Sequence, residues 1–164
     1  MGFSRKWIVG GAMSLAAVVS IGCSQNLESA APQAAAAVKS AFPGTRIVKS
    51  STESDGGMTL YEATLTGDGK DRDVLLSADG SILEVETQIT MADLPEAAAE
   101  AIRRIVGDGK ITVLEKVEVK GKVESGKVVA LDPPTVFYEV KYRNPWGWPG
   151  ESQVAPDGGP VPGH

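Results

Sequence analysis

The chain has 164 residues, of which 42% are apolar, 23% charged and 5% aromatic, a composition typical of one globular domain with an aliphatic core. The chain has 16 Lys and Arg against 21 Asp and Glu, a formal net charge of −5. Phosphate backbones would repel such a chain, so nucleic acid is not expected as a partner. The single cysteine is Cys23 and the single histidine is His164. Catalysis by Ser–His–Asp or Cys–His needs a histidine within a folded site, and zinc sites need several Cys or His ligands. With one cysteine and one terminal histidine, we predict no catalytic residue, no metal ligand, no cofactor and no enzyme. An enzyme that uses only Asp and Glu is the remaining catalytic alternative.

The first 22 residues have the layout of a secretory signal peptide. Arg5 and Lys6 form a positive start, and residues 7–21 form an uncharged apolar run of 15 residues. This run is shorter than the roughly 20 residues that span a bilayer as a helix. The ending Gly22-Cys23 resembles the lipobox of bacterial lipoproteins, in which the cysteine becomes the lipidated first residue. We therefore predict a signal peptide over 1–22 and a membrane anchor on Cys23, the alternatives being an uncleaved anchor or a cut elsewhere.

Removal of the leader and its two cations leaves 14 basic and 21 acidic residues, a net charge of −7. Ser24, rather than Asp, follows the cysteine, which resembles the sorting signal for the outer membrane in enteric bacteria. We expect an exported lipoprotein that faces the periplasm, on the outer membrane rather than the inner. Residues 23–31 are expected to be the lipidated cysteine and a polar tether.

The rest of the chain contains an internal repeat. An Ala-rich stretch opens at Pro32 and ends before Gly44, and a second opens at Pro95 and ends before Gly107, which is the punctuation of helices. Each is followed by strand patterns, by a Tyr-Glu pair, and later by an Asp-Gly turn. The Tyr-Glu pairs and the Asp-Gly turns are separated by 77 and 78 residues, whereas the two helix starts are separated by 63, so one insertion lies in the second half.

This pattern predicts an α+β fold of two tandem repeats, each a helix followed by an antiparallel three-stranded sheet (αβββ). The first repeat covers residues 32–90 and its strands are expected at 46–53, 58–65 and 72–76, with a continuation at 81–87. The second covers residues 91–164, with an inserted hairpin at about 120–134 and a flexible tail.

Taken together, the Leu94-Pro95 helix start, the Gly-x-x-Ile spacing, the Tyr-Glu strand and the Ala-Asp-Gly turn resemble the PepSY-like domains of exported bacterial proteins. These are grouped with folds similar to that of the beta-lactamase inhibitor protein. The resemblance covers about residues 32–158. It implies a non-catalytic binding or inhibitory module and carries over no catalytic residue, because the family pattern has none to match.

The most unusual segment is Asn144-Pro145-Trp146-Gly147-Trp148-Pro149-Gly150. By the repeat alignment it is a hairpin tip, equivalent to the polar tip at 66–73. Two tryptophans on a Pro- and Gly-held turn are a good binding anchor, so Trp146 and Trp148 are our candidate partner-binding residues. The alternative is that both indoles fold back onto a core short of aromatic residues.

Three further patterns favour structural interpretations. Residues 67–73 fail the calcium-loop pattern and are expected to be a charged turn. The alternating Lys and Glu residues of 116–127 are a solvated strand face, or alternatively an exposed edge strand that pairs with a peptide. Glu62 and Glu139 occupy equivalent positions of the two repeats and are expected to face solvent.

From these observations the sequence predicts a lipid-anchored bacterial cell-envelope protein that binds a protein or peptide without catalysis. Inhibition of a peptidase is one form that this binding could take. The alternative is a structural or assembly lipoprotein without a specific regulatory target.

Overall fold

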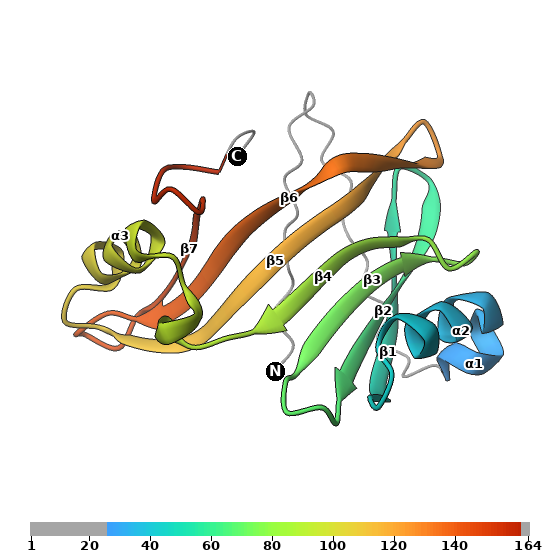
Figure 1. The fold of residues 1–164 in the computed structure, drawn as a ribbon, viewed down its shortest axis with the longest axis horizontal. Helices are drawn as coiled ribbons and strands as arrows, with labels where there is room; N and C mark the ends of the chain where they lie inside the picture. The colour runs from blue at the N-terminus through green and yellow to red at the C-terminus, as the bar shows by residue number, and fades with distance from the viewer. Residues whose placement is uncertain (1–25, 162–164) are drawn as a thin grey trace.

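The computed structural model describes residues 26–161, which form one seven-stranded antiparallel sheet and a few short helices (Figure 1). The strands follow one another across the sheet in chain order, from β1 at one edge to β7 at the other. The elements are α1 Leu27–Ala30, α2 Pro32–Ala41, β1 Arg46–Asp55, β2 Met58–Thr66, β3 Arg72–Ser77, β4 Ile82–Gln88, a 3₁₀ turn Met91–Asp93, α3 Glu96–Val106, β5 Lys110–Glu124, β6 Lys127–Arg143 and β7 Pro149–Val154. The predicted α+β class is confirmed, as are both predicted helices and the four strand segments of the first half.

The fold begins earlier than the sequence pattern indicates. The side chain of Asn26 caps α1 by accepting a hydrogen bond from the backbone N–H of Glu28 at 2.9 Å. Leu27 and Ala31 are buried in the core beside α2. The expectation of a tether as far as residue 31 is therefore wrong for residues 27–31, because Leu27 supplies an apolar side chain that packs with the first helix. The signal peptide and Cys23 lie outside the described residues.

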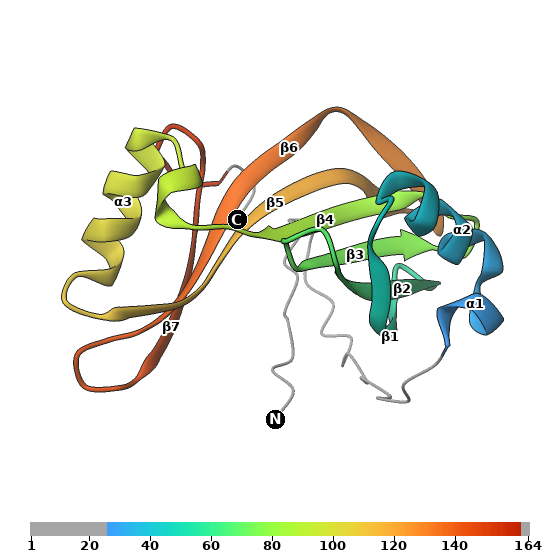
Figure 2. The ribbon, with the colours of Figure 1, turned by 60° about the horizontal axis from the view of Figure 1, so that its bottom comes forward.

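Both long helices pack on the same face of the sheet. Paired residues of an antiparallel sheet point to the same side, and successive residues alternate between sides. Val85 of β4 packs in the core under α2 and is paired with Glu118 of β5. Leu114, which packs in the core under α3, lies four residues before Glu118 with no irregularity between them and therefore points to that side too. Figures 1 and 2 show α2 and α3 toward opposite ends of this face of a bowed sheet.

The hairpin of β5 and β6 is the longest in the sheet, and it contains the segment predicted as an insertion at 120–134. Its tip reaches the tip of the β1–β2 hairpin: a Cβ on Gly56 would lie 2.8 Å from Cγ1 of Val123. β5 pairs with β4 over Glu115–Val119 and with β6 along nearly its whole length. The alternative of an exposed edge strand at 116–127 is therefore wrong for residues 116–119, and the two edges of the sheet are β1 and β7.

The order of a helix followed by three strands occurs twice, as α2–β1–β2–β3 and as α3–β5–β6–β7, and β4 lies between the two sets. Each set is followed by an Asp-Gly turn that touches its helix. A Cβ on Gly80 would lie 3.0 Å from the backbone O of Gln33 in α2, and a Cβ on Gly158 would lie 2.6 Å from the backbone O of Ala97 in α3.

Candidate functional site

The second face of the sheet carries no helix among residues 26–161, and we call it the helix-free face. The alternation that sends Leu114 and Val85 toward the helices sends their neighbours Glu115, Glu84 and Glu86 the other way. Glu139 joins them, because it is paired with Glu115 across β5 and β6. All four glutamates are buried, whereas a plainly solvated sheet face exposes its charged side chains. The helix-free face therefore concentrates carboxylates at low exposure.

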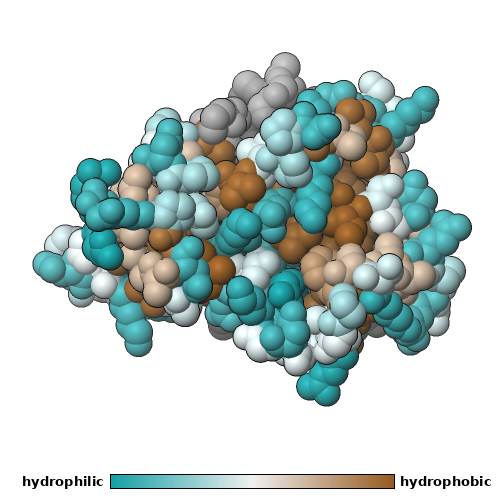
Figure 3. Space-filling model, viewed as in Figure 1, coloured by the Kyte–Doolittle hydropathy of each residue, from teal (hydrophilic) through white to brown (hydrophobic). Residues whose placement is uncertain are grey.

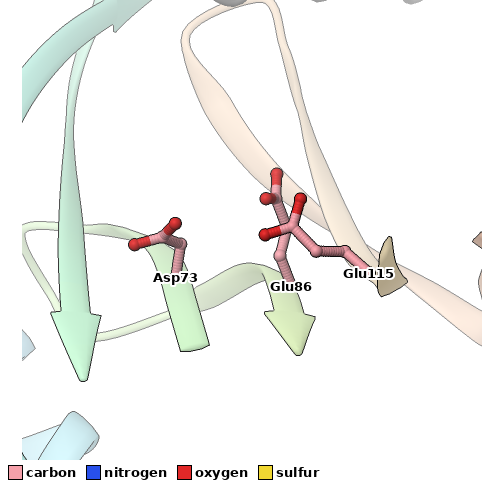
Figure 4. Close-up of side chains that lie close together, drawn as sticks. All are labelled: Asp73, Glu86 and Glu115. Atoms are coloured by element: carbon pink, nitrogen blue, oxygen red, sulfur yellow. The ribbon is translucent and has the colours of Figure 1, made fainter. Parts of the chain in front are cut away.

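The densest part of this face is a group of three carboxylates from adjacent strands (Figure 4). The carboxylate oxygens of Asp73 on β3, Glu86 on β4 and Glu115 on β5 lie within 4.8 Å of one another. The hydroxyl Oγ1 of Thr64 donates a hydrogen bond to Asp73 at 2.7 Å. Such an oxygen-only set is of the kind that hard cations such as Ca²⁺ or Mg²⁺ prefer. The sequence offered no signal for it, because the three residues meet only through strand register.

Glu139 belongs to the same face and does not face solvent as expected, since it is only 8% exposed. Nζ of Lys141 lies 2.8 Å from Oε1 of Glu139 and 3.6 Å from Oε2 of Glu115. Gln153 of β7 donates a hydrogen bond to Glu139 at 3.1 Å. Its counterpart Glu62 is half-buried and accepts a hydrogen bond from Ser51 at 3.0 Å. The expectation of a solvent-facing Glu139 failed because its contacts with Lys141 and with Gln153 of the paired strand β7 are not reported by any local pattern.

Trp146 and Trp148 lie on the turn between β6 and β7, which we call the Trp turn (residues 144–148). Their side chains do not fold back onto the core, since 82% and 70% of the two residues is exposed. Oδ1 of Asn144 accepts hydrogen bonds from the backbone N–H of Trp146 at 3.1 Å and of Trp148 at 3.0 Å. Backbone bonds from Asn144 to Trp148 and from Gly147 to Asn144 close the turn. The indoles are thus presented to the outside by a braced turn.

The predicted charged turn at 67–73 has the geometry of an ordinary turn between β2 and β3. Arg72 donates a hydrogen bond to Asp68 at 2.7 Å, and this bond holds the pKa of the Asp68 carboxyl below its usual range. The residues of the turn satisfy one another, which leaves Asp73, at the start of β3, as the member that points into the helix-free face.

The surface view in Figure 3 shows polar side chains over most of the visible face, with apolar patches between its two ends. The large hydrophobic residues that are exposed in the described part of the chain are the two tryptophans, Val48, Ile105 and Val129. Only the tryptophans exceed 60% exposure. No helix among the described residues has the length and apolar character needed to cross a membrane.

The Asp79-Gly80 turn that touches α2 gives a pH dependence to the fold. Ser77 Oγ and the backbone N–H of Ser81 donate hydrogen bonds to the carboxyl of Asp79. Both bonds lower the pKa of this carboxyl, and the bond from Ser77 has the larger effect. A folded-state pKa below the unfolded value contributes stability above the unfolded pKa, and this stability is lost as the pH falls through the folded value. We expect Asp79→Asn to remove the part of the acid destabilisation that occurs below about pH 4.

Urea unfolding at several pH values from neutral to acidic checks this expectation, with Asp71→Asn, an exposed acid at the end of the β2–β3 turn, as the control variant. The slope of unfolding free energy against pH should become shallower for Asp79→Asn than for Asp71→Asn. Equal slopes in the two variants would contradict the role given to Asp79.

Comparison with known proteins places the fold. No model of a known protein family matches the chain, and no curated protein sequence matches it. Solved structures do match. A BLIP-like protein from Bacteroides fragilis superposes with a TM-score of 0.55 at 18% identity, over 78% of this chain and 80% of that one. A protein from Bacteroides eggerthii proposed to be periplasmic gives 0.58 at 16% identity, over 77% and 81%. A DUF2874 family protein from Bacteroides uniformis gives 0.58 at 17% identity, over 77% and 83%.

These likenesses show a BLIP-like α+β fold for the described residues, in agreement with the resemblance to the beta-lactamase inhibitor protein group. Identities below a fifth show the fold alone. Function must therefore be argued from the surfaces of this chain.

Proposed function

We propose that this protein is a lipid-anchored component of the bacterial cell envelope that binds a protein or peptide and catalyses no reaction. The charged, apolar and small-residue order before Cys23 supports export and lipidation. The similarity to a structure proposed to be periplasmic points to the same compartment. The twofold occurrence of a helix, three strands and an Asp-Gly turn against the helix supports two tandem PepSY-like repeats, with β4 as the connecting strand.

The observation that carries the binding role is the helix-free face. A seven-stranded sheet that packs both helices on one side leaves a broad surface on the other, and this surface holds carboxylates beside apolar side chains. Val117 and Phe137 at its centre are buried, each 1% exposed and packed with Val161. The part of the face that a partner can reach is its margin, where Glu62 and Thr135 lie. A rigid surface of mixed apolar and charged groups suits protein recognition, since docking orders few backbone atoms.

Trp146 and Trp148 remain our candidate partner-binding residues at the end of this sheet. The BLIP-like fold suggests a more specific version of this proposal, in which the bound protein is a peptidase and binding inhibits it. The alternative is a structural or assembly lipoprotein, for which the helix-free face would meet no specific protein.

Photo-crosslinking in living cells distinguishes a protein-binding role from a structural or assembly role. A benzoylphenylalanine residue is introduced in place of Glu62 or Thr135 on the helix-free face, or in place of Glu100, which is exposed on α3. The proposal expects the first two positions to give one shared adduct with a single protein and Glu100 to give none. Lack of an adduct from the helix-free face, in a protein that reaches the membrane normally, favours the structural alternative.

The anchor is tested separately by the intact mass of the protein extracted from membranes, beside a Cys23→Ser variant. The expected mass is that of a chain starting at Cys23 with added acyl chains, and the variant should lack this species. A mass that starts at another residue without acyl chains would refute the anchor and leave the binding role to the crosslinking experiment.

A further inference from the structure

The Trp turn exposes more apolar surface per residue than any other part of the described chain. Trp146 is 82% exposed and Trp148 70%, whereas the next large hydrophobic residue, Val48, reaches 52%. Two indoles side by side in water are unfavourable, and such a patch marks a surface that contacts something else. Tryptophan, with an apolar body and a polar N–H, is suited to a boundary between water and an apolar phase.

The turn is built so that the indoles stay outside. Besides the two bonds to Asn144, Nη1 of Arg143 donates a hydrogen bond to the backbone O of Gly147 at 3.0 Å. Gly147 has a φ of +86°, a conformation that a side chain would oppose and that lets the chain reverse between the two tryptophans. Because the turn is already ordered, contact with a partner costs it little conformational entropy.

A basic rim surrounds the Trp turn. The turn between α3 and β5 lies against it, since a Cβ on Gly109 would lie 2.5 Å from the backbone O of Arg143. Lys110 is paired directly with Arg143 across β5 and β6, and like charges in such a pair destabilise a sheet. The exposed cations of this end are Arg103, Arg104, Lys110 and Arg143, and the exposed acids beside them are Glu100, Asp108 and Glu151.

This end therefore carries four positive and three negative charges, a balance of +1. The sequence from Cys23 onward carries −7, as derived above from its 14 basic and 21 acidic residues. A net positive, aromatic end on an acidic protein is complementary to an anionic lipid surface. The rest of the protein would be repelled by the same surface, and this repulsion would favour contact through the Trp turn.

The distance from the anchor also limits where the domain lies. The fold starts at the Asn26 cap and the buried Leu27, so Cys23 lies only three positions along the chain before the folded part. Three residues reach at most about 10 Å. A lipid on Cys23 would thus hold α1 almost at the bilayer surface. Figures 1 and 2 place α1 and the β6–β7 turn at opposite ends of the long axis, and both toward the same side of the molecule.

We propose that the partner of the Trp turn is the lipid bilayer itself, so that Trp146 and Trp148 form a second membrane contact, at the far end of the molecule from Cys23. The indoles lie at the level of the headgroups, and the four cations of the basic rim contact anionic headgroups. The molecule then lies along the membrane and does not stand on its tether. This inference rests on the lipid anchor proposed above.

The leader contains the third tryptophan of the chain, Trp7, so the processed lipoprotein keeps only Trp146 and Trp148. Its tryptophan fluorescence, excited at a wavelength that tyrosine does not absorb, therefore reports the Trp turn alone. The lipoprotein is purified from membranes, its acylated mass is verified, and it is reconstituted into phosphatidylethanolamine–phosphatidylglycerol vesicles that contain a lipid with a quencher at headgroup depth. The proposal expects a blue-shifted emission, about a two-fold loss of intensity from the lipid quencher, and protection from iodide in the water.

Variants give the contrast. Trp146→Phe and Trp148→Phe each leave one reporter, and both should be quenched by the lipid. Arg104→Glu with Lys110→Glu should reduce the quenching by half or more, since two of four cations become anions. Lys127→Glu, at the exposed tip of the β5–β6 hairpin, is the charge control for Arg104→Glu and for Lys110→Glu made singly, and it should leave the quenching unchanged. Far-UV circular dichroism confirms that each variant is folded.

Three different results would overturn the inference. A correctly acylated protein whose tryptophans are open to iodide and untouched by the lipid quencher retains the anchor but not the second contact. The same result, with protection only when envelope proteins are added, assigns the turn to a protein partner. A purified protein that carries no acyl chains would refute the lipid anchor, and the second membrane contact, which rests on that anchor, would be refuted as well.

Discussion

Ile102→Ala is expected to lower the free energy of unfolding by about 2–5 kcal/mol. Ile102 of α3 is fully buried in the core that α3 forms with Leu114, Tyr138 and Val140. Truncation to Ala removes three carbon atoms from a close-packed site, so the loss combines burial energy with the cost of a cavity. For a domain of this size such a loss is a large part of the total stability.

The control lies one helical turn away. Ile105 belongs to the same helix and is 38% exposed, so Ile105→Ala makes the same chemical change with far less burial lost. We expect it to cost less than about 1 kcal/mol. Chemical denaturation of both variants, followed by circular dichroism, measures the difference. Equal losses would contradict the packing assigned to α3.

The shape of the same transition is informative. The cores under α2 and α3 lie on one face of a continuous sheet, and β4 and β5 pair over five residues. We therefore expect Ile102→Ala to shift a single cooperative transition that includes the half under α2. Two separate transitions would mean that the repeats fold independently and that the central strand pair contributes little coupling.

Gly158→Ala is expected to be strongly destabilising, because it combines a left-handed backbone with a close backbone contact. The residue has a φ of +81°, and a Cβ there would lie 2.6 Å from the backbone O of Ala97 and 3.0 Å from its carbonyl carbon. Both a strained backbone and a clash with the first turns of α3 would follow. We expect a loss of at least about 2–3 kcal/mol, because neither α3 nor the turn can move without opening the core.

Gly69→Ala separates the two causes. Gly69 has nearly the same φ, +85°, but its Cβ would meet nothing within 4 Å. This variant should pay only for the left-handed conformation, about 1 kcal/mol. The difference between the two midpoints of thermal unfolding then measures the contact of the Asp-Gly turn with the helix. A Gly158→Ala protein as stable as Gly69→Ala would show that the turn moves away freely.

The parts of this fold that were predicted are those with local causes. A proline at the start and a glycine after the end predict the helices at 32–41 and 96–106. Asp-Gly and Gly-Gly pairs predict the hairpins. These signals act within a few residues, so a single sequence contains them. The α+β class followed from the alternation between such elements.

The parts that were missed depend on partners far along the chain. Asp73, Glu86 and Glu115 come together because β3, β4 and β5 pair in one register, and no local pattern reports that register. Leu27 was assigned to a polar tether because its apolar role depends on contacts with residues such as Val85, almost sixty positions away. Glu139 was expected in solvent because its hydrogen bond with Gln153 depends on the pairing of β6 with β7, which no local pattern reports.

The two outer strands bear on how neighbouring molecules associate. A meander of seven strands ends in β1 and β7, whose outer backbone groups are a template for strands of neighbouring molecules. The lipid anchor that we propose would concentrate such neighbours in two dimensions. β1 carries Arg46, Lys49, Glu53 and Asp55 along its length, and β7 is six residues long and begins with Pro149. The charges of β1 and the shortness and proline of β7 oppose fibril-like stacking, so molecules held close together by the proposed anchor would remain separate.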